Sequence, residues 1–190
     1  MTDGPFLWYV NRATGVALLV LLTVSVVLGV LASSGRAGGR VPQFVRQDVH
    51  RNISLLSVAL LVGHVASAIL DTFVDIRWWD AFVPVNGGYL PLWLGLGALS
   101  LDLLIVIVLT SLVRARLPYR SWWLVHLLSY AAWGLGVIHG IGIGTDETPD
   151  VVWGLPLTLA CIGAVGLAVV VRVAQGVRAA RRRTSTGVPA

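Results

Sequence analysis

Four histidines form two pairs in this sequence, and each pair lies within one long apolar segment. His50 and His64 are 14 residues apart in HRNISLLSVALLVGHV, and His126 and His139 are 13 residues apart in HLLSYAAWGLGVIHG. Ionisable side chains are costly within lipid and usually face the protein interior with a partner. Neutral imidazole is also a common axial ligand of haem iron. The pattern therefore predicts two ligand couples inside a membrane, each able to hold a haem iron from both sides.

The spacing decides where these side chains lie on their helices. At about 1.5 Å per residue, the two intervals correspond to about 21 and 19.5 Å along a helix. At about 100° per residue, His50 and His64 lie within about 40° of each other around their helix axis. His139 is rotated by about 140° from His126 around the axis of the other helix. We therefore expect one couple toward each membrane face. His139 must therefore approach its haem from a different side, or its helix must bend.

The composition is that of an integral membrane protein. Hydrophobic residues make up 56% of the 190 residues and charged residues only 12%, and the apolar residues occur in unbroken runs rather than stripes. The net charge of +5 comes from arginines beside these runs. That placement favours a role in membrane orientation, and we expect no nucleic-acid partner.

Five segments are long enough to cross a hydrocarbon core of roughly 30 Å, which requires about 20 apolar residues. They are residues 7–31, 49–70, 92–113, 122–143 and 151–173. The predicted fold class is all-α, an integral membrane bundle of five transmembrane helices. Residues 1–176 would form one haem-binding transmembrane domain in contact with lipid, and residues 177–190 a basic, disordered cytoplasmic tail. Residues 72–91 are expected to form a short interfacial helix and a loop on the outer surface.

The connections differ in charge, which predicts the orientation. Arginines gather in the first and third connections and in the tail: Arg36, Arg40, Arg46, Arg114, Arg116, Arg120, Arg172, Arg178, Arg181, Arg182 and Arg183. Acids dominate the other two connections: Asp71, Asp75, Asp80, Asp146, Glu147 and Asp150. The positive-inside rule then places the N-terminus outside and the C-terminus in the cytoplasm of a multi-pass cell-membrane protein. His50 and His126 would lie toward the cytoplasm, and His64 and His139 toward the exterior.

At these histidines the chain resembles the ferric reductase-like transmembrane domain family, which includes the membrane portions of ferric reductases and NADPH oxidases. That family carries two histidines 14 apart on one helix and two 13 apart on a second. The resemblance covers residues 7 to about 143. It implies two b-type haems, an inner one between His50 and His126 and an outer one between His64 and His139.

Two further residues are implied by the resemblance. Arg12, in the string RATG, resembles an arginine that the oxidase branch places near its haems, where it would neutralise a propionate. The alternative is a snorkelling interfacial arginine. Trp133 resembles an aromatic residue that the family often places between its haems, although one residue earlier relative to the first histidine. The alternative is a packing tryptophan.

Asp102 and several glycines complete the candidates. Asp102 lies halfway along the third span, where it would relay protons, orient a ligating histidine, or remain a neutral structural acid. Glycines near the histidines leave room for a flat macrocycle, although close helix packing explains them equally well. They are Gly63, Gly134, Gly136 and Gly140.

The predicted function is di-haem electron transfer across the membrane, from a donor on the cytoplasmic side to an extracytoplasmic acceptor such as ferric iron. Larger members of the resembled family continue into a flavin and nicotinamide domain. This sequence has no GxGxxG-type phosphate loop, so a separate flavoprotein or a membrane quinol is expected as donor. Whether the chain is itself a ferric reductase-like oxidoreductase stays open. The alternatives are a non-redox membrane subunit and a transition-metal transporter; the separation of the pairs along the helices disfavours the transporter.

Overall fold

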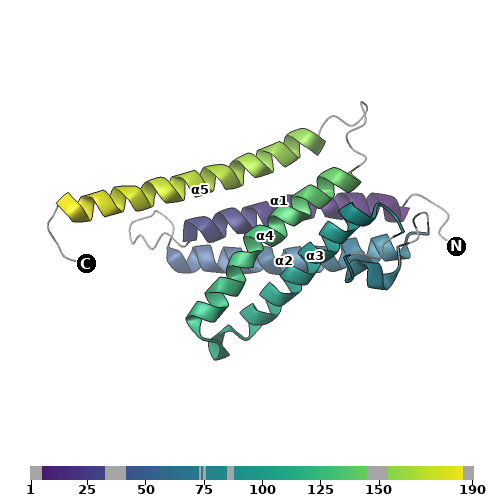
Figure 1. The fold of residues 1–190 in the computed structure, drawn as a ribbon, viewed down its shortest axis with the longest axis horizontal. Helices are drawn as coiled ribbons and strands as arrows, with labels where there is room; N and C mark the ends of the chain where they lie inside the picture. The colour runs from purple at the N-terminus through teal and green to yellow at the C-terminus, as the bar shows by residue number, and fades with distance from the viewer. Residues whose placement is uncertain are drawn as a thin grey trace.

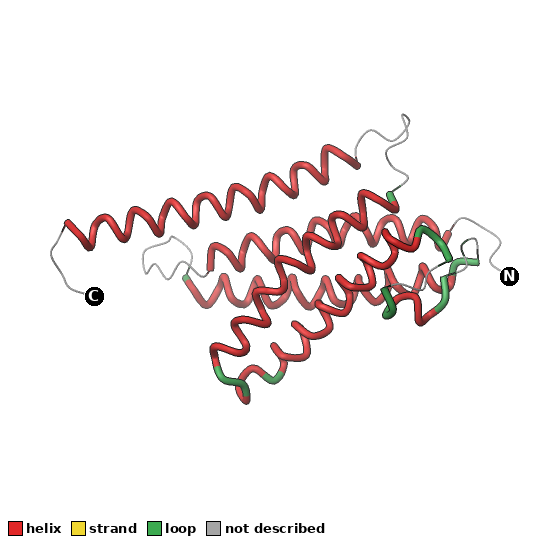
Figure 2. The backbone as a smooth tube through the Cα atoms, viewed as in Figure 1, coloured by secondary structure: helices red, strands yellow, loops and turns green. Residues whose placement is uncertain are grey.

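The computed structural model describes residues 6–32, 42–72, 74, 76–84, 88–144 and 154–185. Almost all of this backbone is helical (Figure 2). The five long helices are α1 (Phe6–Ala32), α2 (Gln43–Leu70), α3 (Pro91–Leu112), α4 (Tyr119–Ile143) and α5 (Gly154–Ser185). Each contains a segment long and apolar enough to cross a membrane. The all-α prediction with five spans is confirmed at this level, and it is the pattern of a multi-pass membrane protein.

Proline marks the beginning of three helices. Pro42 and Pro118 are the N-cap residues of α2 and α4, and Pro91 is the first residue of α3. Proline suits these positions because its fixed φ is compatible with the first turn and its missing N–H has no partner there. Helix α2 therefore begins at Gln43, six residues before the predicted start of the span. Arg46, predicted in the first connection, lies in the first turn of α2 and donates to the carbonyl of Leu31 at 3.4 Å.

The end of α5 differs from the prediction. Residues 177–185 continue the helix to Ser185, where a disordered tail was expected from residue 177. The segment VRAARRRTS is rich in alanine and arginine, which are strong helix formers, so the helix continues beyond the apolar part of the sequence. Residues 186–190 lie outside the described residues. So do several charged residues used to predict the orientation: Arg36, Arg40, Asp75, Asp146, Glu147 and Asp150.

The helices form two antiparallel hairpins and one peripheral helix. Helix α1 packs along α2, and α3 packs along α4, while α1 also contacts α4 and α5. Figure 1 shows α4 crossing the α1–α2 pair, with α5 along one side. Helices α2 and α4 run in the same direction (Figure 1). The two helices that carry the histidines are therefore parallel, as the alternation of five spans requires.

Polar contacts hold each hairpin together. In the first, the Asn11 side chain donates to the carbonyl of His64 at 2.8 Å and to Ser67 Oγ at 3.3 Å. In the second, buried Ser100 donates to the carbonyl of Ala132 at 2.8 Å. Hydrogen bonds of this kind stabilise helix association in a membrane, where apolar burial contributes little.

The connection between α2 and α3 turns back onto α3. Its short 3₁₀ helix η1 (Trp78–Ala81) is the only helical turn in the described part of the predicted interfacial segment. Asp80, counted in the sequence as an outer-surface acid, is only 2% exposed and accepts a hydrogen bond from the backbone N–H of Arg77 at 3.0 Å. The acid therefore stabilises the local turn.

Substitution of Gly142 by alanine tests the packing between α3 and α4. An added Cβ would overlap the Trp93 ring, so we expect Gly142→Ala to reduce the free energy of unfolding by about 1–3 kcal/mol. Gly163→Ala is the matched control because nothing lies within 4 Å of its added Cβ. Thermal unfolding in detergent measures both. Equal midpoints for the two variants would contradict this packing.

Candidate functional site

His50 of α2 and His126 of α4 face each other, which brings together one predicted pair. Their ring centroids are 6.2 Å apart and their planes are inclined at 74°. A bond between a metal ion and an imidazole nitrogen measures about 2.0 Å, and the nitrogen lies about 1.1 Å from the ring centre, so two imidazoles opposed across one metal have centroids about 6 Å apart. The observed separation is therefore suitable for coordination of one metal ion from both sides.

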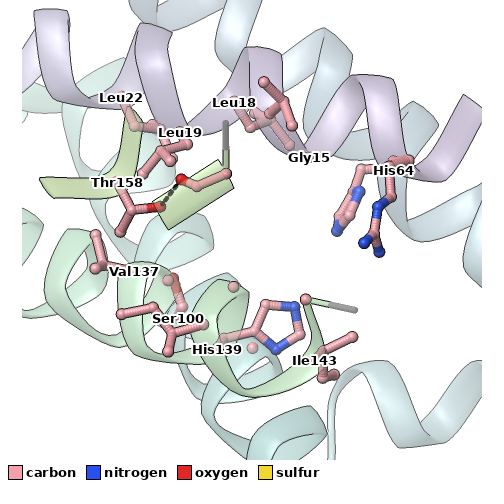
Figure 3. Close-up of a pocket in the computed structure, with 18 of the residues that line it drawn as sticks. Gly15, Leu18, Leu19, Leu22, His64, Ser100, Val137, His139, Ile143 and Thr158 are labelled. Atoms are coloured by element: carbon pink, nitrogen blue, oxygen red, sulfur yellow. Dashed lines mark hydrogen bonds between the residues drawn. The ribbon is translucent and has the colours of Figure 1, made fainter. Parts of the chain in front are cut away.

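His64 and His139 form the second pair, at the other end of the same two helices. Both line one cavity of about 210 Å³, called the outer cavity below after the orientation predicted from the sequence, whose walls come from α1, α2, α3, α4 and α5. Figure 3 shows the two rings entering this cavity from opposite sides. Most of the remaining lining is apolar, with Leu18, Leu19 and Leu22 contributed by α1.

Three of the four histidines are oriented by a backbone carbonyl of a neighbouring helix. The Nδ1 atoms donate to Ser25 O at 3.1 Å from His50, to Asn11 O at 3.0 Å from His64, and to Trp93 O at 2.8 Å from His139. A carbonyl oxygen can only accept, so Nδ1 of each neutral ring carries the proton and Nε2 keeps its lone pair. Hydrogen bonding of this kind fixes the tautomer and the direction of a metal-ligating histidine.

Helix α1 orients both histidines of α2. Asn11 and Ser25 are 14 residues apart, the same interval as His50 and His64, and the antiparallel packing of the two helices brings each carbonyl to one ring. Hydroxyl groups on α1 approach the same nitrogens: Ser25 Oγ is 3.3 Å from His50 Nδ1, and Thr14 Oγ1 is 3.4 Å from His64 Nδ1. This role of α1 was not predicted from the sequence. The matching 14-residue interval between polar residues in an apolar run was the available signal.

His126 is held differently. Its buried Nδ1 has no hydrogen-bond partner among the described residues, and its ring stacks on Trp122 with centroids 5.0 Å apart and planes inclined at 22°. The 13-residue interval rotates His126 by about 140° from His139 around α4, so the two cannot use the same neighbouring helix in the same way. Stacking on Trp122, which lies one helical turn earlier in α4, positions the His126 ring instead.

Glycines lie against three of the histidine rings. An added Cβ would stand 3.2 Å from His64 Cε1 at Gly15, 3.8 Å from His50 Cε1 at Gly29, and 2.5 Å from His139 Nδ1 at Gly97. None of these glycines was singled out in the sequence analysis, because they belong to α1 and α3 rather than to the segments that carry the histidines.

The glycines predicted from the sequence have more space around them. Added Cβ atoms at Gly63, Gly134 and Gly140 meet nothing within 4 Å, and one at Gly136 would lie 3.4 Å from Ser100 Oγ. Gly136 and Gly140 line the outer cavity, and Gly63 and Gly134 do not.

Trp133 and Arg12 both line the outer cavity. The Trp133 indole also donates to Thr23 Oγ1 at 3.0 Å, which links α4 to α1. The Arg12 guanidinium carbon lies 5.1 Å from the centroid of the Trp8 ring. Both residues are therefore at the predicted site, although Trp133 also has the packing role that was the alternative.

Asp102 lies apart from the histidines. It is not among the residues that line the outer cavity, and it makes no hydrogen bond or ion pair with any described residue. Three histidines are already oriented by carbonyl groups, and the fourth has no partner at Nδ1. In this structure Asp102 does not orient a ligating histidine.

The chain matches one known protein family. Residues 6–146 match the family described as "Domain of unknown function (DUF8596)", and the chain belongs to that family. No curated protein matches the chain. The matched range contains α1 to α4 with all four histidines and ends before α5. The matched range thus contains both hairpins of this chain.

The link between Thr23 and Trp133 can be measured by a double-mutant cycle. Thr23→Val removes the acceptor and Trp133→Phe removes the donor, so the double variant should lose less stability than the sum of the single variants. We expect a coupling energy of about 0.6–1.7 kcal/mol, the range of interhelical hydrogen bonds in membranes. Thermal unfolding of the four proteins gives this value. Additive effects would show that the hydrogen bond does not contribute.

Proposed function

We propose that this protein is a di-haem transmembrane electron carrier of the b type, similar in its membrane part to ferric reductases. The observation that supports this most strongly is the separation of 6.2 Å between the ring centroids of His50 and His126. Two imidazoles on different helices take up this distance when a metal ion is bound between them. The second pair, His64 and His139, lines one cavity from two different helices.

The residues around His64 and His139 are compatible with a haem, and the ring separation of His50 and His126 is compatible with two axial ligands. Carbonyl groups hold three of the four rings in the Nδ1–H tautomer, which leaves Nε2 as the metal ligand. The leucines that line the outer cavity provide apolar contacts for a macrocycle, and Arg12 provides a cation at its edge. The glycines beside His64 and His139 let neighbouring helices approach the rings closely.

When bound through two imidazoles, haem supplies one-electron transfer without an open coordination position. The chain's own contribution is to hold each ring fixed, so that little rearrangement accompanies a change of charge. Hydrogen bonds from Nδ1 to carbonyl groups also raise the basicity of the ligand. Trp133 fills space beside the outer pair and ties α4 to α1.

The two histidine pairs are separated by about 21 Å along α2, so that two haems would lie at different depths, one nearer each face of the membrane. The arginine distribution puts the His50 and His126 level at the cytoplasmic side. The proposed donor is a separate flavoprotein or a membrane quinol, and the proposed acceptor is an extracytoplasmic oxidant such as ferric iron. The proposed location is the cell membrane.

The geometry favours this function over metal transport. A transported ion requires several ligands around one small centre. Within the described ranges, no group of three or more His, Cys, Asp or Glu side chains is able to hold a metal ion. The histidines instead form opposed pairs.

Haem content tests the proposal directly. The purified full chain should contain two haems with the sharp α and Soret bands of a reduced bis-histidine haem. His64→Ala and His50→Ala should each retain one haem, because each removes a ligand at one level only. Ser57→Ala is the control, since among the described residues this buried serine of α2 bonds only to the carbonyl of Ile53. A colourless wild-type protein, or two haems in both histidine variants, would contradict the proposal.

Gly97→Ala tests how the outer pair is positioned. The added Cβ would approach His139 Nδ1 to 2.5 Å and displace the ring from the carbonyl of Trp93. We expect the outer haem to bind about 10- to 100-fold more weakly, as for loss of other supporting contacts, while the inner haem stays bound. Gly134→Ala is the control, because nothing lies within 4 Å of its added Cβ and Gly134 does not line the outer cavity. Haem transfer to apomyoglobin measures both, and equal rates for the two variants would contradict the account.

A further inference from the structure

One acidic residue lies on the outward face of a membrane-spanning helix. Helix α3 packs mainly on α4 and η1, and it turns Gly97, Ser100 and Leu104 toward the outer cavity. At about 100° per residue, Asp102 lies on the opposite side of α3 from these three residues. Figure 1 shows α3 at the edge of the bundle.

The residues around Asp102 define this outward face. Leu99, Ile105, Val106 and Leu109 are three residues before and three, four and seven residues after Asp102, which places them on the same side of the helix. Their exposed fractions are 40%, 36%, 44% and 57%. Nearer the start of α3 the same side is covered, since Ala98 is buried and the carbonyl of Pro84 lies against Gly95. The uncovered part of this side is called the Asp102 face below and consists of Leu99, Asp102, Ile105, Val106 and Leu109.

Asp102 is also at the depth where a carboxyl group is most costly. It is the twelfth of the 22 residues of α3, about 16 Å from the start of the helix and close to the bilayer midplane. Acids at this depth are rare and almost always pair with another group. Asp102 has no hydrogen-bond or ionic partner among the described residues. An apolar face with an unmatched acid at its centre is complementary to a helix that brings a cation.

We infer that the Asp102 face is a docking site for a transmembrane helix of a second membrane protein, with an arginine or lysine at mid-depth. A second copy of this chain is a poorer match. Its helical arginines lie toward the ends of the spans, such as Arg12 near the start of α1 and Arg51 in the first part of α2. In a symmetric contact between two copies, each face would offer only another Asp102. The inference does not depend on haem binding.

Designed helices test this charge complementarity. The full chain, labelled at its C-terminal residue, is reconstituted in phosphatidylcholine vesicles with a labelled leucine-rich transmembrane peptide. One peptide carries a single central arginine, and the matched control carries leucine at that position. We expect the arginine peptide to bind the wild-type chain about fivefold or more tightly than the control peptide, as measured by energy transfer between the labels. This preference should disappear in the Asp102→Leu variant. It should remain in the Asp48→Asn variant, which replaces an exposed acid near the start of α2.

Two results would overturn the inference. Equal binding of both peptides to the wild-type chain would show that the Asp102 face tolerates lipid and selects no cation. Energy transfer between two labelled copies of the chain, lost in Asp102→Leu, would show that the occupant is a second copy. Because the first comparison uses the wild-type chain alone, it decides the matter even where Asp102→Leu fails to fold.

Discussion

The hydrogen bond from a histidine Nδ1 to a helix carbonyl is the interaction on which this arrangement depends. A buried imidazole N–H is costly without an acceptor, and three of the four histidines have one. A helix carbonyl has a second lone pair beside the one used within the helix, so α1 and α3 supply acceptors without any polar side chain. Asn11, Ser25 and Trp93 serve in this way through their backbones. The result is a set of rings whose free nitrogens point away from their supporting helices.

This constraint gives a role to each hairpin. In one, α1 orients the histidines of α2, and in the other, α3 orients His139 of α4. Histidines from the two hairpins then face each other, with 6.2 Å between the centroids of His50 and His126. The Trp133 indole crosses from α4 to α1 and connects the hairpins beside the outer cavity. Each hairpin thus pairs a supporting helix with a helix that carries histidines, and the family match covers both hairpins.

The sequence predicted the helices better than the contacts. Long apolar runs fix the number of spans, and an interval of 13 or 14 residues places two histidines at different depths, so both features follow from composition and helix geometry. Beyond the 14-residue interval between Asn11 and Ser25, the carbonyl acceptors carry no signal in the sequence, because every residue has a carbonyl and only the packing of α1 and α3 selects those used. Gly15 and Gly97 were missed for the same reason. The burial of Asp80 and the extension of α5 to Ser185 depend on local bonds that hydropathy does not report. Arg12 and Trp133 were predicted only through a resemblance, and both line the outer cavity, whereas Asp102 was singled out only as a charge.

Electron paramagnetic resonance of the oxidised wild-type protein tests the central claim most directly, because it reports the axial ligands of ferric haem. The account predicts two low-spin ferric signals of equal intensity. The signal of the inner haem should be strongly anisotropic, since the imidazole planes of His50 and His126 are inclined at 74°. High-spin signals, which indicate a missing axial ligand, or the absence of any ferric haem signal would contradict the claim that opposed imidazole pairs define this protein.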